Sequence, residues 1–141
     1  MLDSMRFARA GESLSGEVPL ADLGRLVEGL LSDQGSARYR VQGGMELGRL
    51  VLRLEIDLVV MLRCQYCLEP YMQELRIEQV LPLARNEAEL ERWEKDDPLL
   101  DALVADDSLD VLKLVEDEIL LGLPVVPRHP DGECGKADNQ R

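Results

Sequence analysis

Residues 50–64 read LVLRLEIDLVVMLRC, and their strict alternation decides the fold. Every even-numbered position from Leu50 to Cys64 is apolar, whereas charged residues such as Arg53 and Asp57 occupy odd-numbered positions. A period of two turns one face toward a core and the other toward water, as in an antiparallel sheet. The stretch therefore predicts a long β-strand that is buried on one face only.

A second alternating stretch follows after a short break, and it predicts a second long strand. Its apolar positions are Tyr71, Leu75, Ile77, Leu81 and Leu83. The charged residues Glu74, Arg76 and Glu78 lie between them. Two such strands joined through residues 64–70 form a β-hairpin over about residues 47–84. The tip of this hairpin is the sequence Cys-Gln-Tyr-Cys.

Two stretches outside the hairpin have helical spacing. Pro19 opens the first, where leucines recur every three or four residues over about 19–32. The second covers about 108–122 and follows Asp107 or Ser108, either of which can cap a helix. Together with the hairpin they predict an α+β fold, in which an antiparallel sheet packs against two helices. We expect one domain over residues 1–141.

Three other segments carry weaker signals. Residues 1–18 are mixed and contain Gly and Ser, which favours extended chain. Residues 86–107 carry the densest negative charge and favour a flexible acidic loop, although Leu90 and Trp93 could anchor a short helix. Pro124 begins an extended C-terminal tail, residues 124–141.

Composition bounds the class of protein. Apolar residues make up 45% of the 141, which excludes a fully disordered chain. No apolar run approaches the roughly 20 residues that span a bilayer, and no signal peptide is visible. The cysteine count of three is odd, which argues against a secreted disulfide framework. We therefore expect a cytoplasmic protein.

The net charge of −12 restricts the partners. An acidic surface repels phosphate backbones, so direct RNA binding is disfavoured and a basic protein is the more natural partner. Two alternatives stay open: the acidity serves only solubility, or a local basic face of the sheet binds RNA. The arginines of such a face would be Arg38, Arg40, Arg49, Arg53 and Arg63.

The chain has three cysteines and a single histidine, which are Cys64, Cys67, His129 and Cys134. A C-x-x-C pair with a distant His and Cys has the ligand set of a closed, structural Cys3His zinc site. Four protein ligands leave no open position for a substrate, so Zn2+ would hold the fold together. Two other interpretations remain, namely packed thiols in a reducing cytosol and a redox dithiol.

The sequence contains no recognisable catalytic motif. It contains no Gly-rich phosphate loop and no nucleophile elbow, so a triad with His129 as its base lacks a recognisable serine. Carboxylates are plentiful, but in a chain this acidic their proximity means little. We therefore expect no catalytic residues.

Two motifs carry a family resemblance. Residues 64–70, CQYCLEP, are similar to a C-x-R-C-x-x-P turn, with Tyr66 where relatives commonly have Arg. Residues 110–127, DVLKLVEDEILLGLPVVP, form an acidic helix followed by L-P-x-x-P, after which a His and a Cys follow. In this order of motifs the chain resembles the YceD family of bacterial and plastid proteins, which is linked to accumulation of large-subunit ribosomal RNA.

The resemblance implies a non-enzymatic ribosome biogenesis factor of the bacterial cytoplasm, needed for large-subunit (23S) rRNA to accumulate or be processed. Combined with the charge, it favours action through a basic ribosomal protein or assembly factor on large-subunit precursors. Glu116, Asp117 and Glu118, with the acidic loop, are the expected contacts. The alternative is direct rRNA binding, with Arg53 and Arg63 as contacts. The matching Cys and His positions also support the zinc prediction.

Overall fold

A computed structural model describes residues 2–124 and 127 of the chain. In these residues a five-stranded sheet has the order β1-β2-β3-β4-β5. The strands are β1 (Ser13–Pro19), β2 (Ser36–Glu46), β3 (Arg49–Arg63), β4 (Pro70–Ala84) and β5 (Leu103–Val104). The helices are α1 (Ser4–Ala10), the 3-10 turn η1 (Leu20–Asp22), α2 (Gly24–Val27), α3 (Glu87–Asp96) and α4 (Val111–Gly122).

The long hairpin is confirmed, and it forms the centre of the sheet. β3 pairs antiparallel with β4 from Val51 opposite Pro82 to Arg63 opposite Pro70. The other edge of β3 pairs with β2, and β2 pairs with β1. β5 is short and pairs parallel with β4 at Leu83 and Ala84. Within the described residues, the rest of that edge of β4 has no strand beside it.

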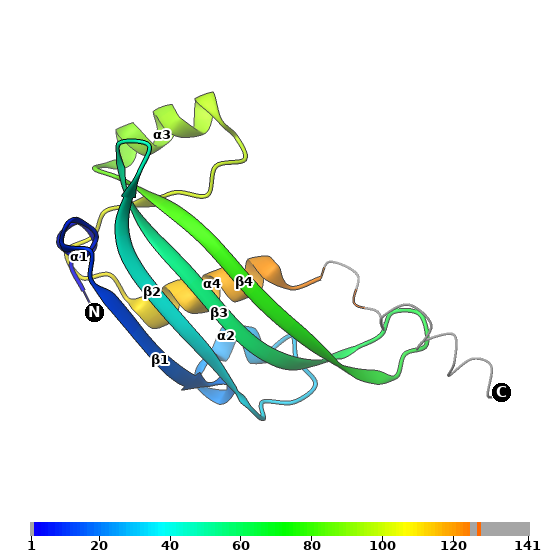
Figure 1. Ribbon diagram of the computed structural model, residues 1–141. Helices are drawn as coiled ribbons and strands as arrows, with labels where there is room; N and C mark the ends of the chain where they lie inside the picture. The colour runs from blue at the N-terminus through cyan, green and yellow to red at the C-terminus, as the bar shows by residue number, and fades with distance from the viewer. Residues whose placement is uncertain (1, 125–126, 128–141) are drawn as a thin grey trace.

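The alternation of β3 divides the sheet into two faces. The even-numbered positions of β3 are buried and belong to the hydrophobic core. They are Leu52, Leu54, Ile56, Leu58, Val60 and Leu62. The helices α2 and α4 cover this core face (Figure 1). The charged side chains of the strands lie on the opposite face, which we call the open face. The predicted α+β fold is therefore correct.

Of the two predicted helices, one is present as expected and the other is much shorter than expected. The helix expected at about 108–122 is α4, which begins after Asp110, whose side chain accepts a hydrogen bond from the amide of Lys113. The helix expected at about 19–32 is far shorter, because only η1 and α2 form there. Gly24 and Gly29 disfavour a continuous helix in this stretch.

Two further helices occupy segments for which the sequence favoured irregular chain. α1 lies where residues 1–18 were expected to be extended, and its ends are capped by Asp3 and by Gly11 at φ 66°. α3 occupies the first part of 86–107, where Asn86 accepts a hydrogen bond from the amide of Glu89. Both helices are defined by caps more than by an apolar stripe.

The two ends of the hairpin carry different parts of the molecule. Figure 1 shows α3 at one end of the long strands and the turn between β3 and β4 at the other. The C-terminal end of α4 points toward that second end. Cys64 and Cys67 lie in this turn, whereas His129 and Cys134 lie outside the described residues.

Candidate functional site

The turn at the hairpin tip is held by its own backbone. The amide of Cys64 donates to the carbonyl of Glu69 at 2.9 Å, and the amide of Leu68 donates to the carbonyl of Cys64 at 2.9 Å. Leu68 adopts a left-handed conformation with φ 63°. The guanidinium of Arg63 donates to the carbonyl of Leu68 at 2.7 Å. These bonds fix the path of the C-x-x-C sequence.

Both cysteines of this turn point inward. Cys64 is fully buried and Cys67 is 8% exposed, whereas Tyr66 between them is 66% exposed. The amide of Tyr66 donates to the sulfur of Cys64 at 3.4 Å. Among the described residues, no group of three or more His, Cys, Asp or Glu side chains could hold a metal ion. Cys64 and Cys67 are two of the four predicted zinc ligands.

The chain that leaves α4 reaches the same turn. The amide of Gln65 donates to the carbonyl of Pro127 at 2.8 Å, a contact between residues 62 positions apart. Gln65 lies between the two cysteines, so Pro127 is held beside the C-x-x-C sequence. The turn and the segment that follows α4 therefore meet at the hairpin tip.

Glu116, one of the predicted partner contacts, makes an internal contact. It is 9% exposed. Its carboxylate accepts hydrogen bonds from the amides of Arg25 and Leu26 at 3.0 and 3.3 Å, and from Nε of Arg25 at 3.1 Å. Asp117 pairs with the outer nitrogen of Arg25. A partner contact by these two residues stays a prediction, and the structure adds that Glu116 anchors α2 to α4.

Glu118 lies on the buried side of α4 and is 4% exposed. Burial, followed by a hydrogen bond and charge from Asp101 and the charge of Asp117, raises the pKa of Glu118 to about 7. Two carboxyl groups that share a hydrogen bond hold one proton between them more tightly than either holds it alone. A partner contact by Glu118 also stays a prediction.

Most of the net negative charge lies in one stretch, residues 86–110, which we call the acidic segment. It contains ten Asp or Glu residues and two Lys or Arg residues, so it contributes −8 of the net −12. Its carboxylates are largely exposed, with the exceptions of Glu89, which is buried, and Asp101, which is half-buried. The amide of Arg85, and then its guanidinium, lower the pKa of Glu89.

Apolar side chains accompany the acidic segment. Leu99 is 94% exposed. Trp93 on α3 packs its ring against the guanidinium of Arg49, which lies 4.1 Å from the ring centroid. This cation–π contact holds α3 near the start of β3. The sequence predicted the acidity of the segment, but it favoured a flexible loop over the short helix that Leu90 and Trp93 could anchor.

The open face of the sheet carries both signs of charge in equal number. The basic residues on it are Arg38, Arg40, Arg49, Arg53, Arg63 and Arg76. The acidic residues on it are Glu17, Glu46, Glu55, Asp57, Glu74 and Glu78. The strand register sets many of them in rows of alternating sign. The face is therefore neutral within an acidic molecule.

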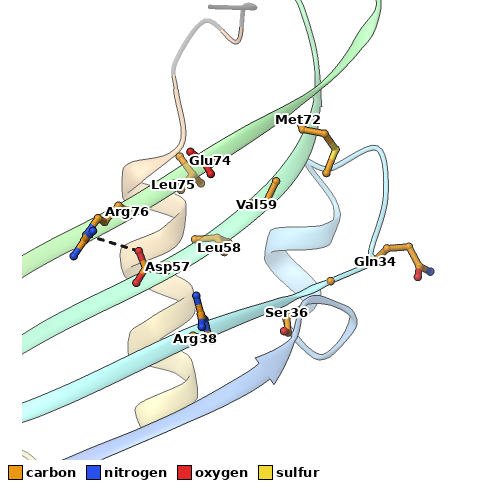
Figure 2. A pocket seen from close by; sticks show the side chains of 11 residues that line it. Gln34, Ser36, Arg38, Asp57, Leu58, Val59, Met72, Glu74, Leu75 and Arg76 are labelled. Carbon is orange, nitrogen blue, oxygen red and sulfur yellow. Dashed lines mark ion pairs between the residues drawn. The ribbon is translucent and has the colours of Figure 1, made fainter.

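The two predicted RNA contacts lie at different places on the open face. Nε of Arg53 pairs with Glu46 at 2.8 Å, while Arg63 belongs to the hairpin tip. A shallow groove of about 660 Å³ lies between them, and sequence reasoning did not foresee it. Figure 2 shows Arg38, Asp57 and Arg76 on neighbouring strands of this groove, with Asp57 and Arg76 paired at 3.8 Å.

Within residues 2–124 and 127, no helix is long and apolar enough to cross a membrane.

Comparison with known proteins identifies a family and similar proteins. The family model described as Large ribosomal RNA subunit accumulation protein YceD matches residues 52–141, more than half of the chain. The Large ribosomal RNA subunit accumulation protein YceD of Haemophilus influenzae is 27% identical over 139 residues, which cover 94% of this chain and 76% of that protein. No solved structure matches. On the extent of the family match, the chain belongs to the YceD family.

Proposed function

We propose that this protein is a ribosome biogenesis factor, needed for large-subunit (23S) rRNA to accumulate or be processed. Membership of a family named for large ribosomal RNA subunit accumulation carries this proposal. The similar protein of Haemophilus influenzae has the same name, and the match to it covers 94% of this chain. The protein acts by binding, because the family is described by the accumulation of an RNA and not by a reaction.

The partner is a basic protein, such as a ribosomal protein or an assembly factor on large-subunit precursors. The concentration of −8 in the acidic segment supports this choice, since such a surface attracts Lys and Arg side chains. Exposed Leu99 gives the same surface an apolar contact point. The acidic segment is therefore the proposed docking surface, and it extends the acidic loop expected from the sequence.

The test uses a deletion strain that is complemented with variant genes. One variant neutralises four exposed carboxylates of the acidic segment. Its substitutions are Glu91→Gln, Glu94→Gln, Asp96→Asn and Asp97→Asn. The matched control neutralises four exposed carboxylates elsewhere, which gives the same change in net charge. Its substitutions are Asp33→Asn, Glu55→Gln, Glu74→Gln and Glu78→Gln.

We expect the deletion to lower the ratio of 23S to 16S rRNA, and the protein to co-sediment with large-subunit precursors. The control should restore both, and the acidic-segment variant should restore neither. A normal rRNA ratio in the deletion strain would refute the ribosomal function. Equal restoration by the two variants would refute the acidic segment as the docking surface and leave the function standing.

Direct binding of rRNA by the open face is a second candidate. Its support is that Arg38 and Arg40 are exposed and form no ion pair within residues 2–124 and 127. It requires an affinity for 23S rRNA fragments that falls steeply with salt. Reversal of charge at Arg38 and Arg40, by Arg38→Glu with Arg40→Glu, should abolish that affinity. Unchanged binding by this variant would reject the candidate.

A further inference from the structure

The turn between β2 and β3 holds a leucine in a strained backbone conformation. The two strands pair up to Glu46 opposite Arg49, so Leu47 and Gly48 form the turn. Their φ angles are 52° and 78°. A turn with positive φ at both central positions favours Asn-Gly, because these residues tolerate the left-handed region and a bulky apolar residue tolerates it poorly. Gly48 meets this requirement, whereas Leu47 does not.

Burial does not explain why position 47 is a leucine. Its side chain is 102% exposed, so it contributes nothing to the core. A single exposed leucine is ordinary on a protein surface. A leucine that is exposed and also strained lowers stability without any gain in packing, and strain of this kind collects at functional positions. Folding therefore does not account for Leu47, and a contact with another molecule does.

The turn lies beside the acidic segment. Figure 1 shows it next to α3, at the end of the sheet opposite the hairpin tip. The guanidinium of Arg49 lies 4.1 Å from the ring centroid of Trp93, so the first residue after the turn contacts α3 directly. Met45, which precedes the turn, is 62% exposed. Two large apolar side chains are thus exposed next to the segment that carries −8 of the net charge.

A hollow of about 220 Å³ opens between the turn and α3. The apolar part of its wall consists of Met5, Leu50, Leu83 and Trp93. Its charged residues already have partners, since Arg85 pairs with Glu89 at 3.1 Å and Arg49 packs on Trp93. Pockets that hold whole small molecules usually measure about 300 Å³ or more, so this hollow suits a single side chain.

Leu68 provides a comparison within the same chain. Among the described residues it is the other non-glycine residue with a positive φ, at 63°, and it is 60% exposed. The turn that contains it is the hairpin tip, at the opposite end of the long strands from α3 (Figure 1). The conformational argument applies equally to both leucines. Charge distinguishes them, because the acidic segment lies at the end that carries Leu47.

From these observations we propose that Leu47 and Met45 are the apolar anchor of the docking surface, and that they receive a basic amphipathic segment of the partner protein. The Lys and Arg side chains of that partner face the acidic segment, and one of its apolar side chains enters the hollow beside Leu47. An apolar centre with charged residues around it is the usual anatomy of a protein interface. This inference rests on the proposed function and adds the kind of segment that the partner presents.

Two synthetic peptides of about 15 residues, roughly four helical turns, test the anchor on the full-length protein. Both carry lysines at the same positions, and one has leucines at helical spacing where the other has glutamines. We expect the leucine peptide to bind the parent about tenfold more tightly than the glutamine peptide, as burial of one leucine side chain implies. Leu47→Asn should remove this advantage and leave the affinity for the glutamine peptide unchanged.

Leu68→Asn is the matched control, because it makes the same substitution at the same kind of backbone position. It should bind both peptides as the parent does. Both variants should unfold at urea concentrations no lower than the parent's, since Asn tolerates a left-handed backbone better than Leu. Neutralising the acidic segment should weaken the binding of both peptides. Its substitutions are Glu91→Gln, Glu94→Gln, Asp96→Asn and Asp97→Asn.

Equal affinity of the parent and Leu47→Asn for the leucine peptide would refute the anchor, as would an equal loss in Leu68→Asn. A Leu47→Asn protein that is less stable than the parent would show that the leucine serves the fold, and it would refute the anchor too. Dimers of the parent that Leu47→Asn dissociates, or a single-stranded RNA oligonucleotide that it binds more weakly, would identify another occupant and overturn the proposal. A normal rRNA ratio in the deletion strain refutes the ribosomal function alone, since the peptide measurements do not involve the ribosome.

Discussion

The carboxylate of Glu116 joins two helices that are about ninety residues apart in the sequence. It accepts hydrogen bonds from the amides of Arg25 and Leu26 at the start of α2. The capping residue of that helix, Leu23, has no side-chain acceptor for them. The acceptor that caps a helix usually comes from the residue just before it, whereas here it comes from Glu116 on α4. No sequence pattern near residue 25 or residue 116 indicates this contact between the two helices. The sequence therefore suggested only a partner contact for Glu116.

Glu116→Ala should destabilise the fold by about 3 kcal/mol, because it leaves buried amides without an acceptor. Glu116→Gln keeps one acceptor oxygen and should cost less. Urea unfolding of both variants measures the effect. The control Glu91→Ala removes an exposed carboxylate of α3 and should change stability by less than about 0.5 kcal/mol. Equal stability of Glu116→Ala and the control would contradict the anchoring role.

Glu118 makes stability depend on pH. Its pKa is raised to about 7 in the folded state, so between about pH 4.5 and 7 the unfolded chain has lost this proton while the folded chain keeps it. Stability from this group is present at low pH and declines as pH rises through that window. Glu118→Gln should therefore stabilise the protein at pH 8 by about 2–3 kcal/mol relative to its effect at pH 4.

Thermal or urea unfolding at several pH values measures the Glu118 effect, and Asp101→Asn is its companion variant. Burial is the main cause of the raised pKa, and Asp101 contributes less. Asp101→Asn should therefore weaken the pH dependence only in part. A Glu118→Gln protein whose stability keeps the parent's pH profile would contradict the assignment.

At the scale of elements, α1 packs directly on β2 at Gly43. A Cβ atom at that position would lie 2.5 Å from the carbonyl oxygen of Phe7 and 2.6 Å from Cα of Ala8. Both contacts are with backbone, so α1 would have to move. Gly43→Ala should cost about 1–3 kcal/mol, as overpacking of a core does.

Gly24→Ala is the matched control for Gly43→Ala. Nothing lies within 4 Å of a Cβ at Gly24, which is the first residue of α2. Alanine also has the higher helix propensity, so this variant should be neutral or slightly more stable. Urea unfolding of the pair compares them. A similar loss of stability in both would show that close packing is not the cause.

Elements were predictable where burial imposed a period. The even-numbered residues of β3 are buried from Leu52 to Leu62, and the hairpin and α4 are accordingly present. Where few side chains are buried, the spacing of apolar residues does not indicate which element forms. α3 has one buried residue, Glu89, and α1 is seven residues long, so caps decide both. α2 is short because glycines and a tertiary contact, not leucine spacing, set its length.

At the scale of the whole molecule, protection from hydrogen exchange should follow the sheet. β3 pairs on both edges and its even-numbered face is buried, so its amides should exchange slowest. α3 lies at one end and has few buried residues, so its amides should exchange fastest among the helices longer than a turn. Peptide-resolved mass spectrometry measures both. Slower exchange in α3 than in β3 would contradict this picture.

The candidate site was predictable in composition but only partly in space. Ligand spacing pointed to Cys64 and Cys67, and the structure brings them into one turn beside Pro127. Net charge pointed to a basic partner, yet it did not locate the charge. The fold does so, because the open face balances its charges while the acidic segment keeps −8. Charge balance across strands depends on register, which no single stretch of sequence contains.

The edge of β4 that has no strand beside it affects how neighbouring copies of the protein can associate. A strand with unpaired amides is a template on which other chains can extend the sheet into aggregates. Pro70 and Pro82 bound this edge, and neither has an amide to donate. Between them Glu74, Arg76 and Glu78 place charge along the same stretch. At the high local concentrations of a folding or expressing cell, these residues keep neighbouring copies from adding strand upon strand.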